Sequence, residues 1–351
     1  MSTRRAGAAA FVLAVTTTGC SAIGESVQDD GPASDRVVVV THDSFSLPKK
    51  LLRQFETESG FEVVVRKAGD AGALTNKLVL TADDPIGDVA FGVDNTFASR
   101  ALDAGVFAAY EHDLPAGAGD HSLPGDDDQR LTPVDNGNVC INVDDTWFDE
   151  RELAPPTTLA DLADPAYRDL LVLPGAATSS PGMAFLLATV AEYGDDWPRY
   201  WADLMENGAK LTAGWSDAYF VDFTAGGGEG DRPIVLSYDS SPAFTVPEGA
   251  DASTTSALLE TCFEQVEYAG VLDGAENVDG AEAFIDFLTG AEVQASLPES
   301  MYVFPVRDDV DLPAEWAAYA VQPDEAYAVD PSEIAANRDD WLREWSDVTS
   351  R

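Results

Sequence analysis

Residues 36–69 read RVVVVTHDSFSLPKKLLRQFETESGFEVVVRKAG, and this stretch predicts a strand, a helix and a second strand. The valine run at 37–40 is typical of a strand that is buried in a sheet, and the run at 63–65 predicts a second strand. Between them, apolar residues recur at the spacing of one helix face: Leu47, Leu51, Leu52 and Phe55. Gly60 follows as the residue that ends the helix. A strand–helix–strand unit of this kind favours parallel strands with the helix packed on one face of the sheet.

The alternation of strands and helices continues as far as residue 106. The pattern predicts a helix at 73–85, a third strand at 87–95 and a further helix at 96–106. Ligands of α/β sheets collect at the carboxyl ends of the strands. In this chain those ends are THDSF at 41–45 and VDNT at 93–96, and we expect binding residues there.

A second strand–helix unit begins at about residue 133. Its predicted elements are a strand at 138–144, a helix followed by a strand at 158–175, helices at 179–194 and 195–212, and a strand at 231–244. With 351 residues, the chain is long enough to form two compact lobes. We therefore expect an α/β protein in which lobe 1 comprises 36–135 plus 265–345 and lobe 2 comprises 136–264.

The charge balance of the chain is strongly acidic. Asp and Glu number 63 against 20 Lys and Arg, which gives a formal net charge of −43. Such a surface repels nucleic acid and anionic lipid, so the sequence predicts neither as a partner. The acids are spread along the whole chain, a pattern typical of a halophilic acidic surface, where salt screens most of the repulsion. The same charge attracts a cationic ligand.

Residues 1–20 predict a signal peptide that ends in a lipobox. An arginine pair precedes an apolar run at 6–15 that is too short to span a bilayer, and TTGC places Cys20 after small residues. The arginine pair resembles a twin-arginine signal, although ordinary secretion stays open. A flexible acidic tether follows at 21–35. We expect the chain to be exported and to be held at the outer face of the cell membrane by a lipid on Cys20, with no other membrane contact.

Cys140 and Cys262 are the other cysteines of the chain. An oxidising exterior favours a disulfide between them, and two buried free thiols are the alternative. Cys140 opens the second lobe and Cys262 precedes the return to the first, so we expect both to flank the hinge. A bridge at that place is expected to limit how far the lobes open.

The segment GWSDAYF at 214–220 combines two large aromatic residues with a carboxylate. Trp215 and Tyr219 are four residues apart, with Asp217 between them, and the glycine-rich loop TAGGGEGDRP follows at 224–233. Aromatic residues at this spacing form either a core stripe on a short helix or one wall of a binding site. Both interpretations stay open on these residues alone.

Short motifs recur in a fixed order over residues 37–310. They are VVTHDSF, GDVAFGVDN, TSSPGMAFLL, GWSDAY, VLSYDSSPAF and MYVFPV. In this order and spacing they resemble the thiamine-binding branch of the solute-binding lipoproteins of ABC importers. The resemblance implies a periplasmic-binding-protein type II fold, with a mixed sheet in each lobe and a hinge between the lobes. It also implies a monomer without cofactor or metal that is not an enzyme, captures thiamine or a thiamine phosphate in the cleft, and delivers it to an ABC permease and its ATPase.

The resemblance further implies which residues surround the ligand. They are Asp43, Ser44, Phe45, Asp94, Asn95, Ser179, Ser180, Trp215, Asp217, Tyr219, Tyr238, Ser241 and Tyr302. Thiamine carries a permanent positive charge on its thiazolium ring, which aromatic faces and carboxylates stabilise. The aromatic residues supply the faces, and the compensating charge is expected from Asp43, Asp94 and Asp217. Tyr302 departs from the family, which more often has a Trp at this position.

Ser179 and Ser180 lie where a helix is predicted to begin. We expect Ser180 to be the N-cap and Pro181 the first helical residue. The free N–H groups and partial positive charge of a helix N-terminus bind hydroxyl and phosphate groups. The resemblance implies that this turn contacts the phosphate arm of the ligand, and an ordinary capped helix without a ligand is the alternative.

Other functions stay open on the residues alone. Acidic and aromatic side chains suit any organic cation, so a polyamine binder on the same fold is one alternative and a ferric-ion binder is another. Iron binders usually bring adjacent tyrosines, and no Tyr-Tyr pair occurs in the sequence. A secreted hydrolase is a third alternative, but the 3 histidines are accompanied by no Ser-His-Asp order, metal-ligand spacing or phosphate-binding loop.

Overall fold

A computed structural model describes residues 35–350 of the protein. The predicted signal peptide at 1–20 with its lipidation site Cys20, and the predicted tether as far as residue 34, lie outside the described residues. Within the described part of the chain, no helix combines the length and the apolar character that are needed to cross a membrane.

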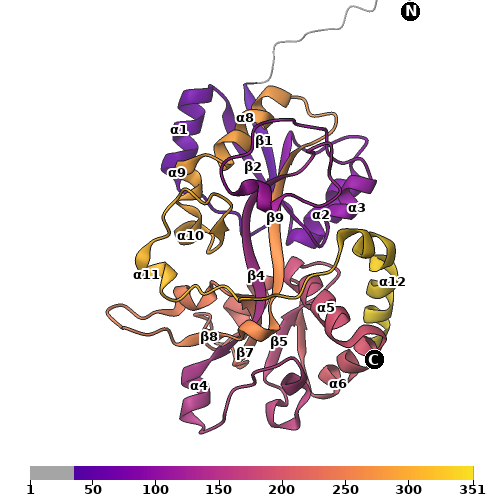
Figure 1. Ribbon diagram of the computed structural model, residues 1–351, viewed down its shortest axis with the longest axis vertical. Coiled ribbons are helices and arrows are strands. Elements are labelled where there is room, and N and C mark those ends of the chain that lie inside the picture. The colour runs from indigo at the N-terminus through magenta and orange to yellow at the C-terminus, as the bar shows by residue number, and fades with distance from the viewer. Residues whose placement is uncertain (1–34, 351) are drawn as a thin grey trace, which may run out of the picture. The chain divides into compact units, whose positions relative to one another are not determined.

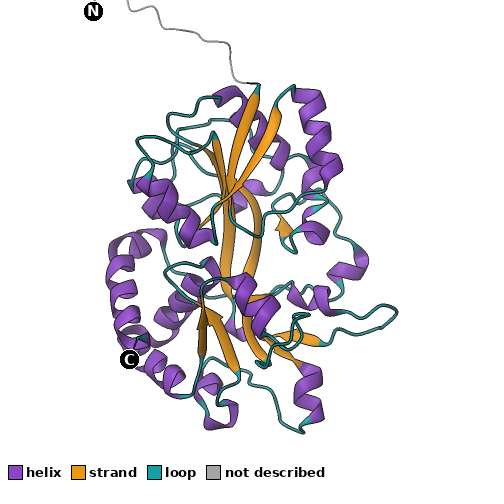
Figure 2. Cartoon of the chain, turned by 180° about the vertical axis from the view of Figure 1, so that it is seen from behind, coloured by secondary structure: helices purple, strands orange, loops and turns teal. Residues whose placement is uncertain are grey.

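One mixed β-sheet runs through the described residues (Figures 1 and 2). Its strands are β1 (Arg36–Thr41), β2 (Glu62–Lys67), β3 (Val89–Asp94), β4 (Thr132–Asp144), β5 (Leu171–Pro174), β6 (Lys210–Thr212), β7 (Ile234–Tyr238), β8 (Thr255–Ala257), β9 (Phe263–Val271) and β10 (Phe304–Pro305). The strand order is β2-β1-β3-β9-β4-β7-β5-β6, with β8 and β10 paired to β4. β1 and β5 are parallel to their neighbours, whereas β9 and β4 are antiparallel to theirs.

Helices pack against this sheet along the whole chain (Figure 2). They are α1 (Lys49–Ser59), α2 (Ala71–Leu80), α3 (Ala98–Asp103), α4 (Asp145–Glu150), α5 (Ser180–Tyr193), α6 (Trp197–Glu206), α7 (Trp215–Asp217), α8 (Val278–Leu288), α9 (Ala291–Gln294), α10 (Leu297–Ser300), α11 (Ala314–Ala317) and α12 (Pro331–Thr349). Most of them follow a strand directly, which is the βα alternation that the sequence predicts.

The first strand–helix–strand unit forms as its sequence predicts. β1 buries Val37, Val39 and Val40, and α1 buries Leu51 and Phe55 on the face that carries the predicted apolar spacing. Gly60 ends α1 with a φ of 81°, a left-handed conformation that glycine adopts without steric cost, and its N–H donates to the Glu56 carbonyl oxygen. β2 then pairs with β1 in parallel register, with Arg36 opposite Glu62.

The long strands β4 and β9 connect two lobes (Figure 1). We name lobe 1 the part built on β1, β2 and β3, with α1–α3 and α8–α10, and lobe 2 the part built on β5, β6 and β7, with α4–α7. β4 pairs with β9 from Thr132 opposite Ala269 to Val139 opposite Phe263, and it continues as the partner of β7 in lobe 2. The predicted two-lobed α/β class is confirmed. The strands of both lobes belong to one continuous path, because β4 and β9 take part in each.

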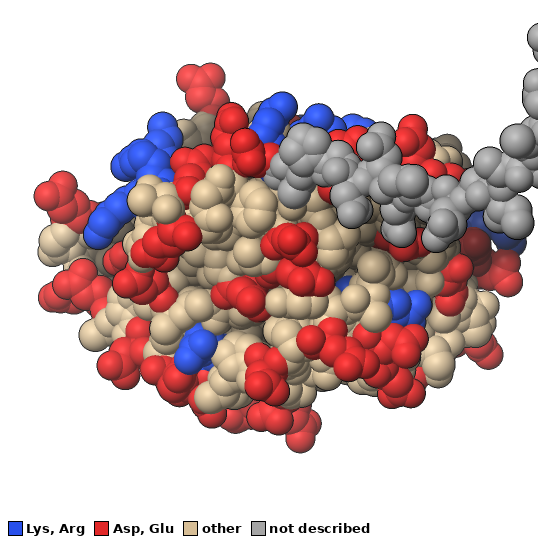
Figure 3. Space-filling view, turned by 90° about the horizontal axis from the view of Figure 1, so that it is seen from above, with Lys and Arg blue, Asp and Glu red and all other residues tan. Residues whose placement is uncertain are grey.

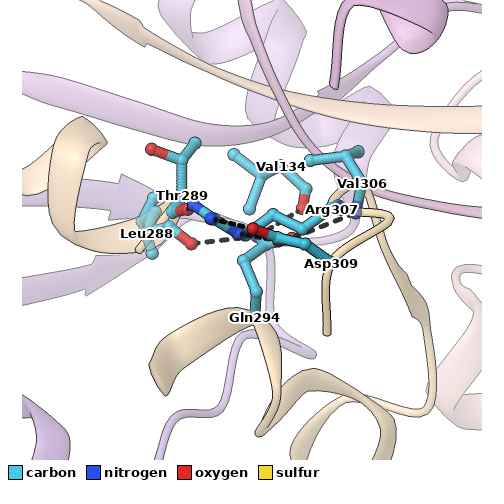
Figure 4. Close-up of polar contacts among 7 residues, drawn as sticks. All are labelled: Val134, Leu288, Thr289, Gln294, Val306, Arg307 and Asp309. Carbon is cyan, nitrogen blue, oxygen red and sulfur yellow. Dashed lines mark hydrogen bonds and ion pairs between the residues drawn. The ribbon is translucent and has the colours of Figure 1, made fainter. Parts of the chain in front are cut away.

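A buried glutamine fixes the segment that follows β10. Gln294 donates to the carbonyl oxygens of Val134 and Leu288 at 2.8 and 3.0 Å, and its own oxygen accepts from the Val306 N–H at 3.0 Å (Figure 4). All of its polar atoms are therefore satisfied inside the protein, as a buried amide requires. These bonds tie the chain around residues 301–306 to lobe 1, next to the start of β4.

Three local predictions need correction. The helix predicted at 195–212 ends at Glu206, and Lys210–Thr212 form the strand β6 instead. The helix predicted within 158–175 is absent from the described residues; Ala160–Ala163 and Pro165–Tyr167 form short 3₁₀ turns instead, because Pro165 has no N–H to continue a helix. The helix predicted to start at Pro181 begins one residue earlier, so that Ser179 is the N-cap of α5 and its side chain makes no capping hydrogen bond.

The C-terminal helix α12 contacts both lobes (Figure 1). Its Trp345 meets Trp201 of α6 edge to face, with ring centroids 5.7 Å apart, and Arg338 lies over the Phe97 ring beside α3 at 4.7 Å. α12 thus packs mainly on lobe 2, and the predicted lobe boundaries at 135, 264 and 345 stay predictions.

Acidic side chains are spread over the surface. Figure 3 shows Asp and Glu distributed over the part of one face that is not drawn in grey, interrupted by few Lys and Arg. The formal net charge of −43 is therefore not concentrated in a single patch on this face.

A disulfide joins Cys140 to Cys262 in the structure. Cys140 lies in β4 and Cys262 directly before β9, next to the paired residues Val139 and Phe263. The bridge therefore ties the two connecting strands to each other at their lobe 2 end. The expectation that it limits how far the lobes open stays a prediction, because both cysteines lie on or next to the strands that connect the lobes.

Replacing both Cys140 and Cys262 by Ser is expected to lower the free energy of unfolding by about 2–5 kcal/mol, because the bridge closes a loop of 122 residues. Urea unfolding of the oxidised wild type and of the double variant measures the difference. Reduced wild type serves as the control and should match the variant. Equal stabilities of oxidised and reduced protein would contradict a structural role for the bridge.

Candidate functional site

A cavity of about 300 Å³ lies between lobe 1 and lobe 2. Lobe 1 contributes the turns after β1 and β2 and the segment 300–303, and lobe 2 contributes the start of α5, the aromatic segment after β6 and the turn after β7. β9 forms the floor through Glu267. The cavity thus lies beside the carboxyl ends of parallel strands, where α/β sheets bind their ligands.

The structure brings many of the predicted binding residues together at this cavity. Those that line it are Asp43, Ser44, Ser180, Trp215, Tyr219, Tyr238, Ser241 and Tyr302. They come from segments as far apart in sequence as β1 and β10, and the fold unites them. Cavities with aromatic walls and a few polar groups are typical small-molecule sites.

The aromatic segment 214–220 forms one wall of the cavity. Trp215 and Tyr219 stack with ring centroids 5.1 Å apart and an interplanar angle of 22°, and Tyr238 meets Trp215 edge to face at 6.1 Å. The Trp215 indole N–H donates to the Ser237 hydroxyl at 3.0 Å, which fixes the ring orientation. Tyr219 also packs on the core residue Phe223, so the segment serves as core stripe and cavity wall at once.

The backbone of this wall is irregular. The short helix α7 runs into a π-helical turn at Ala218–Asp222, a conformation that often occurs at functional sites. The glycine-rich loop packs directly on this turn, since a Cβ at Gly226 would overlap the Tyr219 carbonyl oxygen. The loop therefore needs glycine for close approach to the wall.

Tyr302 lines the cavity from the lobe 1 segment 300–303. Its ring meets Phe244 edge to face at 5.0 Å, and its backbone has a φ of 59°, which is unusual for a residue other than glycine. The Tyr302 carbonyl oxygen accepts a hydrogen bond from the Ser240 hydroxyl of lobe 2. A strained backbone held by a contact between lobes is the kind of feature that persists at ligand sites.

Asp70 links the lobes at the cavity edge, and the sequence interpretation missed it. One of its carboxylate oxygens accepts from the Ala71 N–H at 2.8 Å at the start of α2. The other accepts from the backbone N–H of Trp215 at 2.8 Å. Asp70 therefore connects lobe 1 directly to the aromatic wall of lobe 2.

Asp94 lies behind the cavity wall rather than in it. Its carboxylate accepts from the hydroxyls of Ser180 and Thr96 and from the Phe97 N–H. Burial raises the pKa of Asp94 to about 7, against the opposing effect of these hydrogen bonds. Asp94 thus holds Ser180, a lobe 2 residue that does line the cavity, and forms a second link between the lobes.

The other predicted residues do not line the cavity. Phe45 is buried in the lobe 1 core against Phe91, and Asn95 bonds to the backbone of β9. Ser179 is fully buried at the start of α5, and Asp217 is exposed on the outer side of α7. Their predicted contacts with a ligand stay predictions.

The cavity floor is acidic. Glu267 of β9 lines it, and Asp135 of β4 lies directly opposite Glu267 in the strand pairing. The Glu267 carboxylate is 3.5 Å from the His42 ring nitrogen Nε2. Burial lowers the pKa of His42 to about 4, so the imidazole is neutral at pH 7.

The missed residues differ in the signal that the sequence carries for them. Asp70 follows β2 just as Asp43 follows β1, so the rule on strand ends was sufficient to find it. Glu267 sits inside a strand and depends on the pairing of β9 with β4, which the sequence pattern does not reveal. Phe220 and Phe244 also line the cavity and are 42% and 43% exposed; both lie within the motifs GWSDAYF and VLSYDSSPAF, but exposure to a ligand cannot be told from core packing by their spacing alone.

The arrangement suits the binding of a flat cation. Stacked rings and buried carboxyl groups stabilise positive charge in a low-dielectric cavity. Among residues 35–350, no group of His, Cys, Asp or Glu side chains is arranged so that it could hold a metal ion.

Comparison with known proteins agrees with this geometry. A thiamine-binding periplasmic protein of Brucella abortus is 33% identical over 91% of this chain and 93% of its own length. The thiamine-binding periplasmic protein of Escherichia coli is 28% identical over 90% and 94%. A solved structure of a periplasmic thiamin binding protein superimposes with a TM-score of 0.78 at 27% identity, covering 90% of this chain and 96% of that one.

The model of one protein family, described as bacterial extracellular solute-binding protein, matches residues 84–330. This match covers well over half of the chain, and the curated relatives align with it over nearly their whole length. The chain therefore belongs to the bacterial extracellular solute-binding protein family.

Proposed function

We propose that this protein captures thiamine, or a thiamine phosphate, in the cavity between the lobes and delivers it to an ABC permease with its ATPase. The observation that carries the proposal is the stacked wall of Trp215 and Tyr219 facing an acidic floor at Glu267. A permanently charged aromatic ring is stabilised by both features at once. The thiamine-binding relatives and the motif order support the same ligand.

The proposed capture includes a movement of the lobes. Hydrogen bonds from Trp215 to Asp70 and from Ser180 to Asp94 cross between lobes at the cavity edge, and the Ala73 N–H donates to the Thr178 carbonyl oxygen at 3.1 Å. These bonds must break for a ligand to enter and form again around it. Opening on β4 and β9 as hinge strands is the type of domain motion that closes around ligands.

The proposed role is binding without catalysis, by a monomer that needs no cofactor. Membership of a solute-binding family supports this role. A polyamine or ferric-ion ligand is the alternative that the same fold accommodates.

Replacing Trp215 by Ala is expected to weaken thiamine binding at least tenfold, and replacing Tyr238 as well is expected to weaken it further. The reason is the loss of aromatic faces, each worth about 1–2 kcal/mol to a desolvated cation. Calorimetric titration with thiamine, thiamine monophosphate, thiamine diphosphate, spermidine and ferric ion measures the affinities and ranks the ligands.

Trp147→Ala is the matched control, because this tryptophan of α4 packs under Arg151 and does not line the cavity. It should leave the affinity for thiamine unchanged. Undiminished thiamine binding by the Trp215→Ala, Tyr238→Ala variant, or preference for spermidine or ferric ion in the wild type, would overturn the proposal.

We also propose that the protein works outside the cytoplasm as a lipoprotein anchored through Cys20. Support comes from the order of arginine pair, apolar run and TTGC in residues 1–20, and from the extracellular family. A tether of polar and small residues up to residue 35 gives the binding lobes room to reach a permease.

Cys20→Ser is expected to move the protein from the membrane fraction to the soluble fraction, because the anchoring thiol is lost. Fractionation of producing cells, together with the intact mass of the purified protein, checks this. Cys140→Ser, which leaves Cys20 in place, should remain in the membrane fraction. A Cys20→Ser protein that stays with the membrane refutes the lipid anchor.

A further inference from the structure

Two buried carboxyl groups face each other across the strands that connect the lobes. Asp135 of β4 and Glu267 of β9 are opposite residues in the antiparallel pairing. They are only 1% and 7% exposed, and Glu267 reaches the ligand cavity. Charged carboxylates are almost never this deeply buried unless they are paired or neutralised.

Because the two carboxyl groups are opposite each other and buried, ionising both of them at once is unfavourable. Burial raises the pKa of Glu267 to about 7, while the bond to Asp135 acts in the opposite direction. Burial and the neighbouring Glu267 charge raise the pKa of Asp135 well above its usual range. Asp135 is thus favoured in its protonated form, and Glu267, which lines the cavity, is the member of the pair whose ionisation a ligand can influence directly.

The surroundings of the pair provide no compensating positive charge. The titratable and charged groups that face it or lie close to it on neighbouring elements are His42, Asp43, Lys67, Asp70, Asp94 and Tyr238. His42 is neutral at pH 7, and the Lys67 ammonium donates to the Asp43 carbonyl oxygen at 2.6 Å. Within residues 35–350, Glu267 has no ion pair with a Lys or Arg side chain.

We propose that the Asp135–Glu267 pair is the counter-charge that selects a permanently cationic ligand, and that Glu267 releases its proton to solvent as the cation enters. This inference rests on the proposed function and names the group that recognises the charge. The sequence interpretation expected that charge from Asp43, Asp94 and Asp217. In the structure Asp43 lines the cavity, as expected, and accepts a hydrogen bond from the Gly69 N–H. Asp94 is engaged with Ser180, and Asp217 does not line the cavity, whereas Glu267 is buried at its floor.

Binding and proton release are then linked. A bound cation stabilises the ionised form of Glu267 and lowers its pKa below the value of about 7 in the free protein. The affinity for the cation therefore rises by up to about tenfold per pH unit below pH 7 and levels off above it. A neutral ligand of the same shape gains nothing from this ionisation, so its affinity has no such rise.

Calorimetric titration of the full chain with thiamine at pH 6 and pH 8, in buffers of different ionisation enthalpy, tests the linkage. We expect release of about one proton per thiamine at pH 6 and much less at pH 8. The ligand control is the neutral thiamine analogue with carbon in place of the charged ring nitrogen, and it should bind without releasing a proton.

Three variants identify the carboxyl group that releases the proton when thiamine binds. Glu267→Gln should abolish the release and weaken thiamine binding at pH 8 by at least about thirtyfold. Asp135→Asn should still release the proton, because the Asn amide can donate a hydrogen bond to Glu267, which remains ionisable. Asp239→Asn is the matched control, since burial raises the pKa of this acid to about 6 but it bonds to Asn138 outside the cavity. Asp239→Asn should also release about one proton per bound thiamine at pH 6.

The outcomes separate the inference from the proposed function. Tight binding of thiamine by the wild type without proton release at pH 6 overturns the inference and leaves thiamine capture intact. Release that persists in Glu267→Gln overturns it as well. If Glu267→Gln does not fold, the inference is still tested by two results: proton release by the wild type, and the same release by Asp135→Asn. No binding of thiamine at either pH overturns both the inference and the proposed function.

Discussion

The pairing of β4 with β9 is the constraint on which the rest of the structure depends. These two strands carry the chain between the lobes, and the antiparallel register between them decides which side chains meet at the cavity floor. A shift by one residue would turn every side chain of β9 to the opposite face. The disulfide between Cys140 and Cys262 holds the two strands together at the lobe 2 end, where β4 turns to its next partner β7.

Charge is handled differently at the surface and in the cavity. At the surface, the acidic side chains are solvated and mutual repulsion is reduced by salt. At the cavity floor and behind its wall, burial raises the pKa of carboxyl groups such as Asp94, Asp135 and Glu267, which favours their protonated forms. The acidic composition alone therefore says little about the field that a ligand meets inside the protein.

The aromatic wall shows how core packing and recognition combine. Tyr219 is only 2% exposed and packs on the lobe 2 core, yet its stacked partner Trp215 is held by hydrogen bonds to Ser237 and to Asp70 of lobe 1. The wall is rigid because the core supports it, and its position depends on the lobes being in contact. Pre-organised aromatic faces of this kind reduce the entropy lost when a ligand binds.

Local patterns in the amino-acid sequence were enough to predict the α/β class, the order of the first strands and helices, and many of the residues that line the cavity. Valine runs, helical spacing and the rule on strand ends depend on residues that are close in sequence, so they can be used without knowledge of tertiary contacts. The same signals predicted a helix within 158–175 that does not form, because Pro165 cannot continue it. They also did not identify Asp70 as a residue of the cavity.

Tertiary structure alone decided that one sheet passes through both lobes, that Cys140 and Cys262 bridge neighbouring strands, and that Asp135 faces Glu267. It also placed Phe45 and Asn95 in supporting positions rather than at the cavity. The physical reason is that strand register and burial are set by partners more than a hundred residues away, and a carboxyl group takes its charge state from those surroundings and not from its neighbours in the chain.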